Sequence, residues 1–484
     1  MKKDTLQKIL EIGIALSKEK DIDCLLEQIL TAAMDITHCD GGTLYMKNED
    51  VLEFRIMITK SRGIHQGGSG GEIKMPPVPL SKENVCACGV LYHNLINIPS
   101  VYVSSVYDFS GPKKYDQITG YRTQTMMVVP MEDDKGEVIG VLQLINALDD
   151  EENVIPFRAE YEQILSALGS QAAICLVNRE YAQQIQSMLD SFVRVMTTAV
   201  DQRSPYTANH TKNMALYGKR FIKWLNRQGL EWSFNEKEEY IFLMSVRLHD
   251  IGKLITPTEI MDKKDRLGNN YQRVMDRLDK IRLLTRIERL QGSIGETEEA
   301  QLLEDADRAR ELVNTVNNTG FLTEKLEEQV LEMACRTYEE EDGTVQPWLT
   351  QEERHQLLIR RGTLTEEERQ IMQDHVGMTR RMLEQMEFGE DYKDVVTYAI
   401  QHHERLDGSG YPRGLKGEEM GKESRLLVII DVFEALTSRD RPYKKPMPAE
   451  KAIGILYNMA EKGEIDMEIL NLFEQSKAWM DEGE

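Results

Sequence analysis

The sequence of 484 residues contains little cysteine and no long apolar run. Its six cysteines are too scattered for the disulfide framework of a small secreted protein, so we expect reduced thiols. No stretch of about 18 apolar residues could cross a membrane, and the N-terminus turns amphipathic at once, unlike a signal peptide. These absences predict a soluble cytoplasmic protein that does not contact a membrane.

Basic residues are also scarce, since 59 lysines and arginines stand against 82 aspartates and glutamates, giving a formal charge of -23. Binding of a nucleic-acid polymer relies on a basic face that neutralises many phosphates, so we expect no such partner. The negative charge of the chain is still compatible with a small anionic ligand, if the binding site carries its own cations. The length favours two or more domains, because a single core rarely grows to this size.

The first third of the chain combines helical and strand-like patterns, and two amphipathic helices are expected within residues 4–37. This order predicts an α+β module over residues 1–156, in which helices cover an antiparallel sheet. The expected strands are residues 41–47, 51–59, 125–131 and 137–145.

Cys86 and Cys88 lie in an expected loop of this module, and they could form a redox or metal pair. Two such thiols are more often structural. His38, His65 and His93 share no spacing with one another and are interpreted as isolated surface or structural residues.

Residues 157–200 contain no proline, and their apolar residues recur at alternating intervals of three and four. This pattern predicts a long connecting helix that pairs with a second subunit as a coiled coil. A helix that packs on its own domain is the alternative. The seam residues are Ala182, Ile185, Leu189, Phe192, Met196 and Ala199.

Residues 201–484 are predicted to be almost entirely helical. Capping-box patterns at Thr350 to Glu353 and Thr365 to Glu368 mark two helix starts. The stretch of about 268–356 is rich in charge but keeps regular apolar spacing, which favours an added helical hairpin or coiled arm over a poorly ordered loop.

The most informative feature is an ordered series of histidines and aspartates in this C-terminal part. Imidazole with carboxylate suits iron, manganese or zinc, and the absence of thiolates argues against a structural zinc site. Two such cations could activate water and stabilise both oxygens of an in-line phosphoryl displacement. The series is His210, His249, Asp250, His375, His402, His403 and Asp431.

Local context supports these assignments. Neighbouring residues on a helix point about 100° apart, so His249 can bind one metal while Asp250 bridges to a second. Asp431 lies in an otherwise apolar helix, where an unpaired carboxylate costs several kcal/mol unless it meets a cation. Lys253 can reach a phosphate oxygen, and Arg441 and Lys444 form a basic patch suited to phosphate.

The segments HCDGGTLYM, NLINIPSVY and TGYRTQTMMVVPMEDDKGEVIGVLQLIN resemble GAF domains of the cyclic-nucleotide-binding type, over residues 20–178. GAF domains bind varied ligands, or none beyond a partner subunit. Here Asn146 is followed by Ala147, where a lysine is common in cyclic-nucleotide-binding members. The signal received by this module, a small molecule or a protein, therefore stays open.

The motifs HDIGK, HHE, DGSGYP and DVFEALTS…RPYK, with the lone His375, are similar to those of the HD-GYP family of HD metal-dependent phosphohydrolases. The resemblance covers residues 190–475 outside the insertion. It implies an all-helical domain that hydrolyses cyclic di-GMP to pGpG, often to GMP, with two or three iron or manganese ions. It also implies a contact with a diguanylate cyclase through the GYP loop.

Residue roles follow from the same resemblance. The seven residues of the series are the implied metal ligands, and Asp250 and Lys253 are the implied catalytic residues. The implied substrate contacts are Lys253, Gly410, Tyr411, Arg441 and Lys444.

The sequence departs from the family pattern in three places. Tyr206 stands where members with three metals carry an acidic ligand, so two metals are expected. Residues 255–258 replace the usual Gly-Ile-Pro-Asp, and the insertion at 268–356 has no counterpart in the plain domain.

These observations predict a dimeric cyclic di-GMP phosphodiesterase regulated by its GAF module. One alternative is a preference for 3′,3′-cyclic GMP-AMP, because the metals contact only phosphate. A second is a non-catalytic receptor for a cyclic dinucleotide. A different HD phosphohydrolase acting on a mononucleotide fits the DGSGYP motif poorly.

Overall fold

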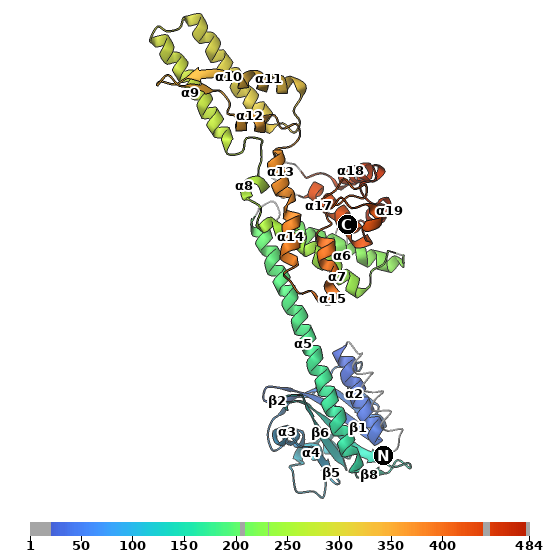
Figure 1. The fold of residues 1–484 in the computed structure, drawn as a ribbon. Helices are drawn as coiled ribbons and strands as arrows, with labels where there is room; N and C mark the ends of the chain where they lie inside the picture. The colour runs from blue at the N-terminus through green and yellow to red at the C-terminus, as the bar shows by residue number, and fades with distance from the viewer. Residues whose placement is uncertain (1–20, 204–208, 231, 439–445, 481–484) are drawn as a thin grey trace. The chain divides into compact units, whose positions relative to one another are not determined.

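The computed structural model describes residues 21–203, 209–230, 232–438 and 446–480, and the chain divides into two compact units, Met1–Leu189 and Asp190–Glu484 (Figure 1). The helical pattern expected before residue 21 lies outside the described residues, as does Tyr206. No helix in the described ranges is long and apolar enough to span a membrane.

The N-terminal unit contains an antiparallel sheet in the order β3-β2-β1-β7-β6-β5, with β4 paired to β2 and β8 paired to β7. The four predicted strands are confirmed as β1, β2, β6 and β7, whereas the shorter strands were missed. The strands are β1 (Cys39–Asn48), β2 (Val51–Thr59), β3 (Ile64–Gly67), β4 (Val78–Pro79), β5 (Ile96–Ile98), β6 (Met126–Glu132), β7 (Val138–Leu148) and β8 (Val154–Ile155).

The two faces of this sheet carry separate cores. On one face, α2 (Ile22–Thr37) and the start of α5 (Glu160–Arg203) bury residues such as Ile29 and Leu168. The other face packs against α3 (Val85–Tyr92) and against Phe109, the residue before α4 (Ser110–Thr119). Cys86 and Cys88 are buried within α3 rather than in the expected loop, because the segment packs its apolar side chains against the sheet.

The long connecting helix is present as α5, which runs unbroken for 44 residues. Its exposed apolar stripe consists of Tyr181, Ile185, Met188, Phe192 and Val195, spaced alternately by four and three residues. The stripe shares Ile185 and Phe192 with the predicted seam, whereas Leu189 and Met196 are partly buried in the chain itself.

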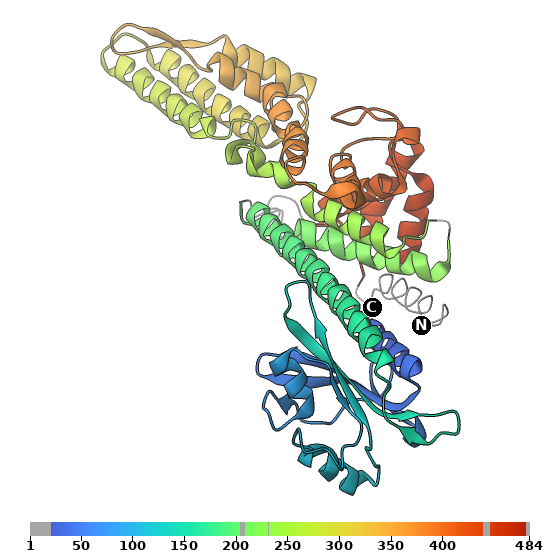
Figure 2. The ribbon, with the colours of Figure 1, turned by 60° about the horizontal axis from the view of Figure 1, so that its bottom comes forward.

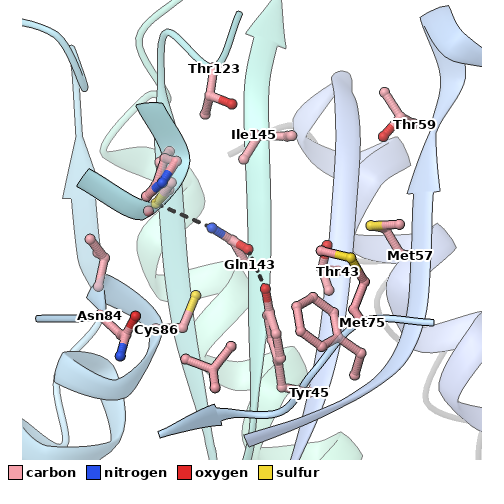
Figure 3. A pocket seen from close by; sticks show the side chains of 16 residues that line it. Thr43, Tyr45, Met57, Thr59, Met75, Asn84, Cys86, Thr123, Gln143 and Ile145 are labelled. Carbon is pink, nitrogen blue, oxygen red and sulfur yellow. Dashed lines mark hydrogen bonds between the residues drawn. The ribbon is translucent and has the colours of Figure 1, made fainter. Parts of the chain in front are cut away.

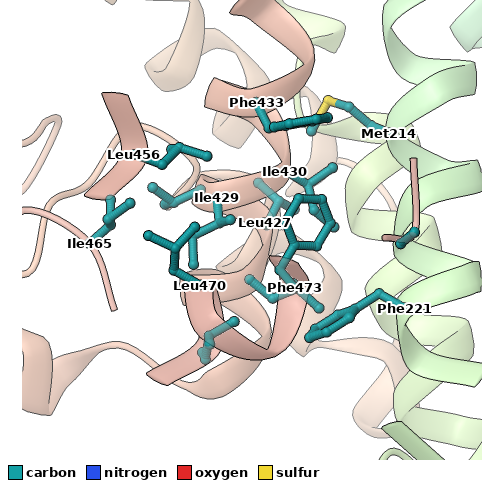
Figure 4. Packing of buried hydrophobic residues seen from close by; sticks show 14 of the residues in the cluster. Met214, Phe221, Leu427, Ile429, Ile430, Phe433, Leu456, Ile465, Leu470 and Phe473 are labelled. Carbon is teal, nitrogen blue, oxygen red and sulfur yellow. The ribbon is translucent and has the colours of Figure 1, made fainter. Parts of the chain in front are cut away.

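The C-terminal unit is helical apart from one hairpin. Its main core lies between α6, α7, α17, α18 and α19, where Phe221, Phe433 and Phe473 pack edge to face (Figure 4). The helices outside the insertion are α6 (His210–Gln228), α7 (Glu236–Leu248), α8 (Thr258–Met261), α13 (Glu366–Gln373), α14 (His375–Leu383), α15 (Gly389–Tyr392), α16 (Asp394–Ala399), α17 (Lys422–Thr437), α18 (Ala449–Glu461) and α19 (Met467–Ser476).

The insertion forms an arm with its own hydrophobic core, which includes Leu278, Val313 and Trp348. Its two long helices lie side by side (Figure 2). The predicted helical hairpin is thus confirmed, and both predicted capping boxes form, at α12 and α13. The arm contains α9 (Asn270–Leu290), α10 (Glu296–Asn318), α11 (Glu324–Ala334), α12 (Gln351–Leu357) and an unpredicted hairpin of β9 (Thr337–Glu339) and β10 (Val345–Pro347).

Charged side chains hold together the two segments that connect the arm to the rest of the C-terminal unit. Arg266 is fully buried and donates to the carbonyl oxygens of Val316, Thr319 and Ile359. Lys263 forms two 2.7 Å bonds to the Glu368 carboxylate. The Thr363 hydroxyl donates to the Lys263 carbonyl at 3.4 Å, so the chain leaves and rejoins the domain at one place.

Candidate metal centre

The structure brings all seven predicted ligands together, although their positions span 222 residues of sequence. Most of them sit at helix ends, where backbone geometry fixes the direction of a side chain. His210 and His375 are the first residues of α6 and α14, and His249 caps the end of α7. His402 and His403 follow α16, and Asp431 lies within α17.

Their ligand atoms form three overlapping groups, each within 4.8 Å. The groups are His375 with His402 and His403, His210 with His249 and Asp431, and His249 with Asp250 and His402.

Asp250 connects these groups because its two carboxylate oxygens face different histidines. Oδ1 lies 3.4 Å from His375 Nε2 and 3.7 Å from His402 Nε2. Oδ2 lies 3.2 Å from His249 Nε2 and 3.9 Å from His210 Nε2. A carboxylate in this position can bridge two cations, the role expected for it from its place beside His249.

Three of the histidines are oriented in the same way. The Nδ1 atoms of His249, His375 and His402 each bond the backbone carbonyl three residues earlier, at 2.6 to 2.7 Å. That bond makes Nδ1 the donor, so Nε2 presents its lone pair to the centre. Such outer hydrogen bonds fix the tautomer and the ring orientation of metal-binding histidines.

His210 is held by a carboxylate instead, which the sequence reasoning missed. Its Nδ1 bonds the buried Glu434 carboxylate, whose other oxygen accepts from Asn213 Nδ2 at 3.0 Å. Glu434 follows Asp431 by one turn of the same apolar helix. Like Asp431, Glu434 is a carboxylate among apolar residues of the helix, and this signal was present in the sequence.

The electrostatics suit cation binding. Burial holds the pKa of His402 well below its usual range and lowers that of His403 to about 3, so both rings are neutral at pH 7. Burial opposes ionisation of Asp250, but the neighbouring His249 and Lys253 outweigh it and hold the pKa of this carboxyl well below the usual range.

Two buried polar atoms at the centre of the site, His249 Nε2 and Asp250 Oδ1, have no hydrogen-bond partner among the described residues. An unpartnered buried polar group is costly, and both atoms are ordinary metal ligands. The donor set of five imidazoles and two carboxylates therefore fits divalent transition-metal ions.

A close contact between two segments positions His249 and His375. A side chain on Gly252 would meet the His375 carbonyl oxygen at 2.0 Å, so only glycine allows this approach. The fully buried Thr379 accepts from the Gly252 amide and donates to the His249 carbonyl, both at 3.0 Å. Thr379 thus ties together the two chain segments that flank the arm.

The GYP loop contains the DGSGYP motif, residues 407–412, and is anchored by Glu404. The buried Glu404 carboxylate accepts from the amides of Arg413 and Leu415 at 2.8 and 2.9 Å. Gly410 lies directly against the Glu404 backbone, where a side chain would clash at 2.5 Å. The Tyr411 ring lies 4.8 Å from the His403 ring, and burial raises the pKa of its phenol. The loop therefore places Tyr411 beside the ligands.

Two further charged side chains, Lys253 and Asp201, lie near the predicted ligands. Lys253 donates to Asp250 Oδ2. Asp201, on α5, was not singled out from the sequence. Its Oδ1 is buried and has no hydrogen-bond partner in the part of the chain that the structure describes. Burial raises the pKa of Asp201 to about 6, while the nearby His210 lowers it. Arg441 and Lys444 lie outside the described residues.

Two family models match the chain, the GAF domain over residues 21–176 and the HD domain over residues 301–469. The chain contains a GAF domain followed by an HD domain. The HD match includes His375, His402, His403 and Asp431, and the ligands up to Asp250 precede it. The predicted combination of domains and the fold class are confirmed.

Curated relatives match parts of this chain. The 3′3′-cGAMP-specific phosphodiesterase 1 of Vibrio cholerae is 39% identical over 24% of this chain and 26% of its own length. The cyclic di-GMP phosphodiesterase of Thermotoga maritima is 38% identical over 22% of this chain and 28% of its own. A cyclic di-GMP phosphodiesterase response regulator of Xanthomonas campestris is 29% identical over 44% of this chain and 58% of its own.

The chain thus spans between about a quarter and just over half of the length of these relatives. Among solved structures, the GAF domain of an Acinetobacter phosphoenolpyruvate-protein phosphotransferase is 14% identical, covers 38% of this chain and 99% of its own, and has a TM-score of 0.30.

Proposed function

We propose that this chain is a metal-dependent phosphodiesterase that hydrolyses cyclic di-GMP to pGpG and on to GMP. The observation that carries the proposal is Asp250, whose two oxygens face two sets of histidines. A shared carboxylate between nitrogen ligands is the arrangement that two-metal phosphoryl hydrolases use. The printed names of the relatives support the substrate class.

The metal ligands would be the seven residues of the series. We propose two ions, iron or manganese, because imidazole and carboxylate donors suit these metals. When bound, such ions stabilise negative charge on a phosphoryl group and lower the pKa of an attacking water.

The remaining steps belong to the protein. Lys253, now bonded to Asp250, provides a positive charge that can move to a phosphate oxygen as charge develops there. Tyr411 keeps its proton and can donate a hydrogen bond to the substrate. Glu404 holds the loop that carries Tyr411 and Gly410. Arg441 and Lys444 are proposed as further phosphate contacts.

Regulation and assembly extend the proposal. The GAF domain is proposed to receive the signal, and α5 to transmit it to the HD domain. The heptad-like stripe of α5 is proposed as the contact with a second copy of the chain, because exposed apolar residues at this spacing are typical of a coiled-coil seam. The GYP loop is proposed as a contact for a diguanylate cyclase.

A product time course tests the activity. Full-length protein loaded anaerobically with iron or manganese is incubated with cyclic di-GMP, and pGpG and GMP are quantified. We expect turnover that the double substitution His249→Ala with Asp250→Ala abolishes. His355→Ala, an exposed histidine of the arm, serves as the matched control. Normal turnover by the double variant would refute the proposal.

The same assay with 3′,3′-cyclic GMP-AMP tests the second candidate substrate, which the Vibrio cholerae relative's name favours. A faster reaction with 3′,3′-cyclic GMP-AMP would mean that this dinucleotide, and not cyclic di-GMP, is the proposed substrate. Metal analysis separates the enzyme from a receptor that only binds the dinucleotide. Protein that retains no transition metal and hydrolyses neither dinucleotide would favour the receptor.

A further inference from the structure

The GAF domain contains a cavity of about 220 Å³ between its sheet and the first turns of α3 and α4 (Figure 3). It lies on the sheet face opposite the one covered by α2 and α5. Thr43, Tyr45, Gln143 and Ile145 line its floor from the two central strands, and Asn84, Val85 and Cys86 line its wall from α3.

The lining is uncharged. None of the described residues that line the cavity is an aspartate, glutamate, lysine, arginine or histidine. Burial raises the pKa of the Cys86 thiol to about 12, so this group is also neutral at pH 7. One lining residue bonds an anion, since Thr123 donates to the buried Asp116 carboxylate at 2.8 Å.

Among the described lining residues, an anionic ligand would therefore be desolvated without a side-chain cation to meet it, at a high cost. No side chain caps the start of α3, so its first amides can donate hydrogen bonds to a ligand. The dipole of an eight-residue helix offsets only a small part of the cost of burying a full negative charge. A carbonyl oxygen suits these amides at no such cost.

The remaining contacts favour an aromatic compound with a hydrogen-bond acceptor. Met57, Met75 and Met126 bring three flexible thioethers to the cavity, and sulfur packs well against aromatic rings. Gln143 accepts from the Tyr45 hydroxyl at 2.9 Å, which directs its amide nitrogen the other way. That nitrogen meets Met126 Sδ at 3.4 Å, a weak acceptor that a ligand oxygen can replace.

The volume of the cavity also limits the size of its ligand. A cavity of about 150 Å³ can hold benzene, so about 220 Å³ accommodates roughly nine non-hydrogen atoms. A cyclic mononucleotide has about two and a half times that number of non-hydrogen atoms and carries a negative charge. We propose that this cavity binds a small neutral aromatic compound with a carbonyl-type acceptor, and that it excludes cyclic nucleotides despite the resemblance of the domain to their receptors.

The test uses two probes that differ in charge but hardly in shape, 4-fluorobenzamide and 4-fluorobenzoate. Each is titrated into the full-length chain in EDTA, so that carboxylate binding at metals is not counted, and followed by fluorine NMR. We expect 4-fluorobenzamide to bind with a Kd on the order of 1 mM and the benzoate at least tenfold more weakly.

Variants locate the binding. Met75→Trp fills the rim of the cavity and should weaken benzamide binding at least tenfold. Leu91→Trp, an exposed position of α3 outside the cavity, is the matched control and should bind normally. Gln143→Leu should weaken the benzamide but leave 4-fluorotoluene unaffected.

Three results would overturn the proposal. They are equal or tighter binding of the benzoate, no benzamide binding at about 10 mM, and binding of cyclic GMP that Met75→Trp abolishes. None of them bears on hydrolysis by the HD domain, so the two proposals succeed or fail separately.

Discussion

Thr379 is an uncharged side chain that connects the chain segments around the candidate metal centre. Its hydroxyl donates to the His249 carbonyl and accepts from the Gly252 amide, so its two partners lie on either side of Asp250 in the sequence. Thr379 itself lies on the helix that begins with His375. The amide of Gly252 and the carbonyl of His249 depend on it because both are buried. Thr379 is therefore a positioning residue, which holds ligands from both sides of the arm without touching a metal.

Thr379→Val keeps the shape of the side chain but removes the hydroxyl. We expect a loss of about 1–3 kcal/mol in unfolding free energy, since buried polar groups lose their partner, and a roughly tenfold or greater loss of metal affinity. Chelator competition measures the affinity and denaturant titration the stability. Thr379→Ser, which restores the hydroxyl, should recover most of both. Unchanged metal affinity in the valine variant would argue against a positioning role.

The buried thiols allow a prediction of how the free energy of unfolding changes with pH. Burial raises the pKa of Cys86 to about 12 and that of Cys39 to about 11, above the ordinary 9.0. A raised folded pKa stabilises the protein fully below the unfolded value, and this contribution is lost as pH rises through the folded value. We expect unfolding free energy to fall between about pH 9 and 11, less steeply in Cys86→Ala.

Alkylation at pH 8 checks the same residues directly. The exposed Cys24 and Cys335 should react within the native protein, whereas Cys39 and Cys86 should react only after unfolding. Rapid native labelling of Cys86, located by peptide mass spectrometry, would contradict the raised pKa of its thiol.

At the scale of elements, periodicity predicted the long strands and helices because each repeats its pattern many times. The strand expected at 51–59 is β2 within the same bounds. Strands of two or three residues, such as β5 and β8, carry too few side chains to show a period and were missed. The capping boxes were found because their hydrogen bonds are local in sequence.

For the candidate metal centre, the sequence predicted which histidines and aspartates lie close together. Its supporting residues could not be predicted, because their roles depend on contacts between distant segments. A threonine within a helix gives no signal that it bonds residues 127 and 130 positions away, as Thr379 does. The same holds for Arg266, whose burial depends on carbonyl groups from two later segments of the arm.

The exposed stripe of α5 gives a prediction about assembly. Ile185→Glu with Phe192→Glu places charges in the proposed seam, and we expect the full-length chain to become monomeric. Gln183→Glu, on the far side of the helix from the stripe, is the matched control and should stay dimeric. Light scattering with size-exclusion chromatography measures the mass. A wild-type monomer, or a dimer that survives both charges, would refute this seam.

For the whole molecule, the arm behaves as a separate folding unit. It has its own core, and the fully buried Arg266 finds its partners within it. Its two ends meet where Thr363 bonds the Lys263 carbonyl. We therefore expect that the HD domain does not need the arm to bring the predicted ligands together.

Removing residues 264–362 and joining Lys263 to Thr363 through two glycines tests this independence. We expect the shortened chain to fold and to bind the same number of metal ions as the full chain, because the Lys263–Glu368 bonds and Thr379 remain. Circular dichroism and metal analysis provide the measurements. A shortened chain that folds but has lost its metal would show that the arm helps to form the centre.

The adjoining ends of the arm also bear on how the protein folds. Asp250 and His375 are separated by roughly 125 residues, but a folded arm shortens the flexible path between them to about 26, which lowers the entropic cost of closure by about 1.4 kcal/mol. An arm that folds first thus shortens the flexible loop that must close to form the site. Mutations that unfold it would slow formation of a site that they do not touch.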